Sequence, residues 1–440
     1  MSGVRQKPAW LAGATDVIVI GAGHAGLAMS SLLSRYGVDH VVLERGEVAN
    51  AWRHERWASL KLLTPNWQTR LPGQAYSGDD PDGFMPVAEL IRFIENYARN
   101  NRAPVRTHTR VTSVRREDGH YRISTNRGNY VSNAVVLATG ACNMASIPAA
   151  AADVPQQIAQ LTPLDYRSPE QLAPGHVLVV GASATGLQLG DELLRAGHDV
   201  TLAVGEHVRM PRSYRGRDIF YWLERSGIHN ERYDEVEDIS RGRRLPSPQL
   251  IGSHDRAILD LNCLADQGAA ITGRLMGVRN GVAQFSGSLR NVCALADLKM
   301  NRLLARIDEI ADADDAPAGE RFAATRVDDE PQLTLDLDKA GVRTIIWATG
   351  FRPDYSWLEV PVLDRKGRLI HDGGLVASPG MYVLGLPLMR RRKSSFIFGI
   401  EDDARDIAWH LLDFLSSNAK ENANDVHQDD MPELGIRRSA

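Results

Sequence analysis

The sequence predicts an α/β protein with two Rossmann-like dinucleotide-binding domains, the second inserted into the first. Three observations lead to this prediction. An apolar strand pattern, a glycine-rich turn and a helix start follow one another in "DVIVIGAGHAGLA", residues 16–28. The same succession recurs in "HVLVVGASATGLQLG", residues 176–190. Two apolar strands end in Ala-Thr-Gly, at 138–140 and at 348–350, on either side of the second unit.

The first glycine-rich turn has the G-x-G-x-x-G spacing that suits the diphosphate of a dinucleotide. Gly21 permits a tight strand-to-helix turn, Gly23 lets the backbone approach the pyrophosphate, and Gly26 lets the helix pack close to the strand. The helix start offers unpaired N–H groups and the positive end of its dipole. The next strand pattern, "VDHVVLERG", ends at Glu44, where a carboxylate can bind ribose hydroxyls.

The second turn repeats this pattern with one change. Gly181 and Gly186 hold the outer positions, and Ser183 replaces the middle glycine. Serine is small, and its hydroxyl can donate to a phosphate. Thr185 belongs to the same helix start. We therefore expect a second nucleotide site here.

In the second unit, the segment that follows the strand after the helix indicates NADPH rather than NADH. The strand "HDVTLAV" lacks an acidic residue at its tip, whereas "GEHVRMPRSYRGRD" is rich in arginine. We expect Arg209 and Arg212, with Arg215 and Arg217 nearby, to meet the 2′-phosphate. Glu206 could instead serve NADH.

The two Ala-Thr-Gly endings suggest places where the chain passes near a cofactor or crosses between domains. Thr139 and Gly140, and Thr349 and Gly350, are therefore candidate cofactor contacts. An insertion follows from this arrangement. The expected divisions are residues 14–164 and 336–417 for the two parts of the first domain, 165–335 for the inserted domain, and 418–440 for a flexible tail.

Composition narrows the functional classes. The 440 residues carry 51 basic and 55 acidic side chains, a net charge of −4 that does not favour nucleic acid. The start lacks an apolar signal segment, and no run reaches the ~18 apolar residues of a membrane span, so we expect a cytoplasmic protein. Cys142, Cys263 and Cys293 form no close pair, which argues against a disulfide reductase.

Three other features concern a loop, a basic run and the aromatic side chains. Residues 311–332 are acidic and rich in Pro and Ala, and they predict a solvated loop. The basic run "RRRK", residues 390–393, could face cofactor phosphates, although a charged surface is the commoner explanation. Aromatic residues that include Trp67 and Tyr221 could line a substrate site, although most aromatic side chains belong to a core.

Taken together, these features resemble the flavin-containing monooxygenase-like family, especially the plant auxin-synthesis flavin monooxygenases and their bacterial relatives. The resemblance extends over residues 14–415 and includes "LERGEVANAWRHERWASLKLLTPNWQTRLPG" and "FMPVAELIRFIENYARN". It implies FAD at the first turn, with Arg45, Trp52 and Arg53 beside the adenosine and isoalloxazine and with the backbone of Val111 against adenine. It also implies that "YVLGLPLMRRRKSSF" closes on the flavin ring.

The resemblance implies an enzyme in which NADPH reduces FAD and O2 then forms a C4a-(hydro)peroxyflavin that oxidises a small organic substrate. It assigns no catalytic side chain and no metal, and it leaves the oligomeric state open. Two alternatives remain: an NAD(P)H-dependent flavin reductase or oxidase that releases hydrogen peroxide, and a non-catalytic, nucleotide-responsive flavoprotein. The sequence also departs from the family. The F-x-G-x-x-x-H segment is absent, and Leu63 stands where animal-type members have an asparagine.

Overall fold

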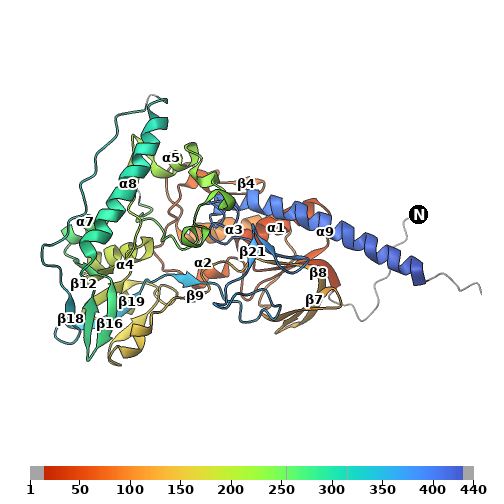
Figure 1. The fold of residues 1–440 in the computed structure, drawn as a ribbon, viewed down its shortest axis with the longest axis horizontal. Helices are drawn as coiled ribbons and strands as arrows, with labels where there is room; N and C mark the ends of the chain where they lie inside the picture. The colour runs from red at the N-terminus through yellow and green to blue at the C-terminus, as the bar shows by residue number, and fades with distance from the viewer. Residues whose placement is uncertain (1–13, 254, 315, 430–440) are drawn as a thin grey trace, which may run out of the picture.

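The structure is a computed structural model that describes residues 14–253, 255–314 and 316–429. Two separate sheets form its two domains (Figure 1). The first is mixed, with parallel strands at its centre, and the second is entirely parallel. Strand order in the first sheet is β21-β22-β23-β8-β1-β2-β5, with β6 and β7 attached to β8. In the second sheet the order is β10-β19-β11-β12-β15. The predicted α/β fold with two dinucleotide-type domains is confirmed.

The first sheet is built around β1 (Ala14–Ile20), which pairs in parallel with β2 (His40–Leu43) and β8 (Gly128–Leu137). Its last four residues are buried on both faces, as an unbroken apolar run in a parallel sheet requires. The remaining strands of this sheet are β5 (Val105–Arg106), β6 (Val111–Glu117), β7 (His120–Thr125), β21 (His371–Asp372), β22 (Leu375–Val376) and β23 (Met381–Val383).

The second sheet divides its core between two faces. Within β11, Val177 and Val179 belong to one apolar cluster, and Leu178 and Val180 belong to another, as the two-residue period of a strand dictates. The strands of this sheet are β10 (Ala159–Leu161), β11 (His176–Val180), β12 (Val200–Val204), β15 (Ala270–Gly273) and β19 (Val342–Trp347).

This pairing moves the domain boundaries. β10 and β19 hydrogen-bond within the second sheet, so the inserted domain extends beyond the expected bounds of 165–335 at both ends. The crossings are made by a two-stranded ribbon of β9 (Met144–Ala145) and β20 (Phe351–Arg352). Strand pairing is a long-range property that the local patterns did not reveal. The small remaining strands are β3 (Arg70–Leu71), β4 (Gln74–Ala75), β13 (Ser213–Tyr214), β14 (Arg217–Asp218), β16 (Leu275–Arg279), β17 (Val282–Phe285) and β18 (Thr334–Asp336).

Helices cover the sheets. α1 packs on β1 and β2, and α9 packs on α1 and β8, while α4 packs on β11 and β12 (Figure 1). The α-helices are α1 (His24–Arg35), α2 (Asn50–His54), α3 (Val87–Asn100), α4 (Ala184–Arg195), α5 (Ile219–Arg225), α6 (Ile239–Gly242), α7 (Leu261–Asp266), α8 (Leu289–Ala311) and α9 (Ile400–Asp429). The short 3-10 helices are η1 (Asn66–Gln68), η2 (Ala149–Asp153), η3 (Pro169–Gln171), η4 (Ile228–Asn230), η5 (Tyr233–Glu235) and η6 (Ile397–Gly399).

The first part of the expected flexible tail, from residue 418, belongs to a helix, and its flexibility stays a prediction. α9 continues to Asp429 as one helix, seen in Figure 1 as the long blue element. The remainder of the tail, 430–440, lies outside the described residues.

In the predicted solvated loop at 311–332, the described residues form no strand, but they are tied to the body of the protein. Arg215 donates from Nε to the carbonyl oxygen of Pro317 at 2.5 Å, and its backbone N–H donates to Glu320 at 2.8 Å. The N–H of Thr325 donates to Asp297 at 2.8 Å. This segment is therefore a strap across the inserted domain.

The basic run 390–393 is neither a phosphate site nor a solvated surface. Arg391 forms ion pairs with Asp403 at 2.6 Å and with Asp406 at 3.0 Å, both in α9. Arg390 pairs with Asp406, Lys393 pairs with Asp402, and Arg392 pairs with Glu231 of the inserted domain. The run is a clamp that joins α9 to the segment around η4 and η5.

The clamp yields a stability prediction. Arg391→Leu removes the cation beside Asp403, whose side chain is fully buried, so the carboxylate loses its main partner. We expect the free energy of unfolding to fall by about 3 kcal/mol in denaturant titrations. Arg405→Leu breaks only the exposed pair with Glu401 and should cost about 0.5 kcal/mol or less. Equal losses in the two variants would contradict this assignment.

Candidate functional site

The three glycines of the first turn are glycine for different structural reasons. A Cβ atom on Gly21, at φ +109°, would lie 2.5 Å from the carbonyl oxygen of Ala138. A Cβ on Gly26 would lie 1.9 Å from the carbonyl oxygen of Gly21. Gly23 is different, because no heavy atom lies within 4 Å of its Cβ position and its φ of −80° suits any residue. Protein packing therefore explains Gly21 and Gly26, whereas the open space at Gly23 fits a ligand.

Glu44 follows β2 and lies beside this turn. Its buried carboxylate accepts hydrogen bonds from the backbone N–H groups of Ala22 at 2.8 Å and Gly46 at 3.0 Å. These bonds fix the carboxylate at the edge of the turn. Each of its oxygens keeps a further lone pair that can accept from a ribose hydroxyl.

His24 is a candidate site residue that the sequence did not single out. It begins α1 directly after Gly23, and its Nε2 atom is buried with no hydrogen-bond partner among the described residues. Burial lowers the pKa of His24 to about 4, so the imidazole is neutral near pH 7. A buried nitrogen without a partner, one residue after Gly23, makes His24 a candidate for contact with a polar group of a ligand. Its position immediately after Gly23 was the available signal.

The second turn repeats the construction of the first. A Cβ on Gly181, at φ +115°, would lie 2.2 Å from the carbonyl oxygen of Ala348, and one on Gly186 would lie 1.9 Å from that of Gly181. Ser183 precedes α4 with extended backbone and makes no capping hydrogen bond with its side chain. Ser183 and Thr185 are both half-buried.

The two Ala-Thr-Gly endings are linked through the segments that follow them at the domain boundary. Thr349 donates from Oγ1 to the carbonyl oxygen of Ser146 at 2.6 Å, and Ser146 N–H donates to Gly350 at 2.9 Å. Asn143 donates from Nδ2 to the carbonyl oxygen of Thr139 at 2.8 Å. Gly140 and Gly350 have positive φ angles and open space at the Cβ position. The β9–β20 ribbon thus joins the edges of the two nucleotide turns.

The other expected flavin contacts lie around α2 and β6. Arg45 is ion-paired with Glu55, and Arg53 is paired with Glu47 and Glu95. Trp52 is half-buried on the first core, with the guanidinium of Arg56 5.4 Å from its ring centre. Val111 is half-buried at the start of β6. Contact of these four residues with a flavin stays a prediction.

The arginines expected at a 2′-phosphate have other partners. Arg209 is buried and binds Asp260 at 2.7 Å and Asp297 at 2.6 Å. Arg212 is buried, pairs with Asp218 at 2.8 Å, and lies 4.7 Å from the ring centre of Phe84. Their assignment to the phosphate is corrected, because both guanidiniums are neutralised inside the inserted domain.

Arg274 lies beside the end of β12 and is another candidate for the 2′-phosphate. It follows β15, next to the end of β12, and its side-chain stem lies 3.9 Å from the Cβ position of Gly205. Its guanidinium is exposed and has no carboxylate partner among the residues that the structure describes. Glu206, the alternative ligand for NADH, pairs with Lys299 at 3.2 Å. Only the strand pairing brings Arg274 to this edge.

Leu63 lies at the boundary between the domains. It packs against the cluster around α5 and α8, and its carbonyl oxygen accepts from Nη1 of Arg212 at 2.8 Å. Gly252 touches the same segment, because its Cβ would lie 2.3 Å from the carbonyl oxygen of Leu62. The segment carrying Leu63 is therefore held by the inserted domain.

A metal site, a disulfide and a membrane-spanning helix each have requirements that the described part of the chain does not meet. No group of His, Cys, Asp and Glu residues there is arranged to hold a metal ion. All three cysteines are free. Across residues 14–253, 255–314 and 316–429, no helix combines the length and apolar character needed to cross a membrane.

Comparisons with known proteins agree with this geometry. The family model "Pyridine nucleotide-disulphide oxidoreductase" matches residues 18–236. An uncharacterised CzcO-like oxidoreductase of Geobacillus kaustophilus is 32% identical over 401 residues, which cover 90% of this chain and 98% of the relative. A probable indole-3-pyruvate monooxygenase of Arabidopsis thaliana is 27% identical over 218 residues, 46% of this chain and 49% of the relative. The chain belongs to the flavin monooxygenase-like oxidoreductases.

A solved structure shows the same fold for this oxidoreductase. The flavin-containing monooxygenase of Stenotrophomonas maltophilia matches with a TM-score of 0.65 at 19% identity, over 91% of this chain and 99% of that chain. The family resemblance, the enzyme class and the expected cofactors, FAD and NADPH, agree with these findings.

Proposed function

We propose that this oxidoreductase is an FAD- and NADPH-dependent monooxygenase that oxidises a small organic substrate through a C4a-(hydro)peroxyflavin. The observation that carries the proposal is the pair of nucleotide turns whose Ala-Thr-Gly edges are joined by the β9–β20 ribbon. An enzyme that passes electrons between two dinucleotides needs two such sites at a common boundary.

The first turn fits FAD. The space at Gly23 admits a pyrophosphate, the buried carboxylate of Glu44 can accept ribose hydroxyls, and the unpaired Nε2 of His24 can bond a polar atom. Ser183, Thr185 and the N-terminus of α4 offer hydroxyls and backbone N–H groups to the pyrophosphate of NADPH. The bound flavin supplies hydride acceptance and oxygen activation, and the side chains bind, orient and exclude water.

Substitutions in the first turn test flavin binding. Gly23→Val places a side chain in open space, so the protein should fold normally but lose at least about tenfold in FAD affinity. Gly26→Val places it against backbone and should instead destabilise the fold by roughly 2 kcal/mol or more. Flavin content after purification and thermal unfolding separate the two effects. A folded Gly23→Val protein with full flavin content would overturn the assignment.

Arg274 tests the choice of NADPH. We expect Arg274→Gln to raise the Kd for NADPH about tenfold, since a charge-assisted bond to the 2′-phosphate is lost, and to leave NADH unchanged. Anaerobic flavin reduction at varied concentrations of each nucleotide measures both. Arg279→Gln, at the far end of β16, is the matched control. The same loss for NADH, or none for NADPH, would count against this role.

Oxygen consumption with NADPH distinguishes oxygenation from the oxidase alternative. Leu63 cannot donate a hydrogen bond but offers a dry wall, which slows peroxide release. We therefore expect oxygenated product to account for most of the NADPH consumed when a substrate is present. Product mass and peroxide are measured in the same reaction. Peroxide equal to the NADPH consumed, with every substrate in a broad screen, would support the oxidase.

A further inference from the structure

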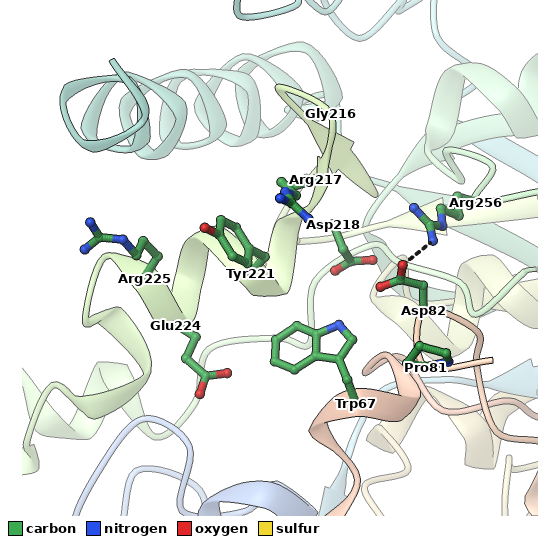
Figure 2. Close-up of a pocket in the computed structure, with 10 residues that line it drawn as sticks. All are labelled: Trp67, Pro81, Asp82, Gly216, Arg217, Asp218, Tyr221, Glu224, Arg225 and Arg256. Atoms are coloured by element: carbon green, nitrogen blue, oxygen red, sulfur yellow. Dashed lines mark ion pairs between the residues drawn. The ribbon is translucent and has the colours of Figure 1, made fainter. Parts of the chain in front are cut away.

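A cavity of about 570 Å³ lies between the first domain and α5 of the inserted domain (Figure 2). The first domain contributes the segment around η1 and residues 81–82, and the inserted domain contributes β14, α5 and Arg256. Its size suits a small organic molecule. The charges and aromatic rings around the cavity determine which kind of ligand can bind there.

Two aromatic side chains form the apolar part of the cavity. Figure 2 shows Trp67 and Tyr221 on either side of the open space, and both are half-buried. Trp222 supports Tyr221 from α5, with ring centres 5.0 Å apart and an edge-to-face angle of 82°. Two such faces favour a flat, aromatic group between them.

Most of the charges around the cavity are already paired. Arg225 bonds Asp314 through two nitrogens at 2.9 and 3.1 Å. Arg256 pairs with Asp82 at 3.3 Å. Glu224 pairs with Arg70 at 3.2 Å and accepts from Gln68 at 3.1 Å. The charges of these side chains are therefore balanced within the protein, without a ligand.

Two groups in the wall are available to a ligand: the exposed guanidinium of Arg217 and one oxygen of Asp218. The guanidinium of Arg217 lies 5.2 Å from the ring centre of Tyr221 and has no carboxylate partner within the described chain. Asp218 is buried, and its Oδ1 accepts from Arg212 and from Phe220 N–H, each at 2.8 Å. Its Oδ2 has no partner among the described residues. A ligand that satisfies both must carry an anionic group and an N–H donor.

We propose that this cavity binds an aromatic α-amino acid or a close analogue. The ring lies between Trp67 and Tyr221, the carboxylate pairs with Arg217, and the ammonium group donates to Asp218. Arg212 connects Asp218 to the carbonyl oxygen of Leu63, so the cavity adjoins the segment that the family resemblance places beside the flavin. The inference that such an amino acid is a substrate rests on the proposed function. The inference that it binds in this cavity does not.

Calorimetric titration of the oxidised, full-length protein without NADPH tests the binding site. The probes are L-phenylalanine, 3-phenylpropionate without the amine, 2-phenylethylamine without the carboxylate, and L-alanine without the ring. We expect L-phenylalanine to bind about tenfold more tightly than each of the other three. Binding of 3-phenylpropionate or L-alanine as tight as that of L-phenylalanine would overturn the proposal.

Variants assign the contacts. Arg217→Gln should weaken L-phenylalanine about tenfold and leave 2-phenylethylamine unchanged, whereas Tyr221→Leu should weaken every aromatic probe. Arg225→Gln is the matched control, because that exposed arginine is held by Asp314, and it should change neither affinity. Unchanged binding of L-phenylalanine to Arg217→Gln would refute the carboxylate contact.

Turnover with NADPH and O2 then tests the substrate class separately. Oxygenated L-phenylalanine, or an oxygenated analogue such as L-tryptophan, supports it. If such amino acids bind but only other compounds are oxygenated, the substrate assignment is overturned while the binding site stands. If the proposed monooxygenase function itself fails, peroxide appears without oxygenated product from any compound.

Discussion

The architecture depends on one close approach, made once in each domain. The turn after β1 in one domain, and the turn after β11 in the other, pack against the backbone of an Ala-Thr-Gly strand end, at Ala138 and at Ala348 respectively. The contact leaves no room for a Cβ on Gly21 or Gly181. This packing covers the side of each turn that faces the Ala-Thr-Gly segment. The opposite side, at the start of the helix, is therefore left free for a ligand. The arrangement of both nucleotide sites follows from it.

The same contact explains why the domains are joined where they are. Each Ala-Thr-Gly segment lies under a nucleotide turn, and each is also where the chain leaves one domain for the other. The β9–β20 ribbon therefore ties the two turns by a short path. A second connection, the clamp at 390–393, lies far from it in sequence and joins α9 to the inserted domain through Arg392 and Glu231. These attachments, together with the bond from Arg212 to the carbonyl oxygen of Leu63, restrict how the inserted domain can move.

The sequence predicted the features that local chemistry determines. The two turns, Glu44 and the order of the domains could be read from spacing, because each depends on neighbouring residues. The strand pairing could not, so the domain boundaries moved to include β10 and β19. The strap and the clamp were missed for the same reason, because their acidic partners are distant in sequence. His24 was visible but unremarkable until its nitrogen proved to be buried and unpaired.

The arginines show why a basic segment does not by itself locate an anion site. A guanidinium that is removed from water must find a carboxylate within the protein, since an unpaired buried charge is very costly. Arg209 and Arg212 satisfy this requirement internally, and their pairing consumes the charge that the sequence suggested for a phosphate. An exposed guanidinium has no such obligation, and it can remain unpaired until a ligand arrives. Arg217 and Arg274 meet this condition at two different edges of the inserted domain, so burial, rather than the number of arginines, separates structural cations from those available to ligands.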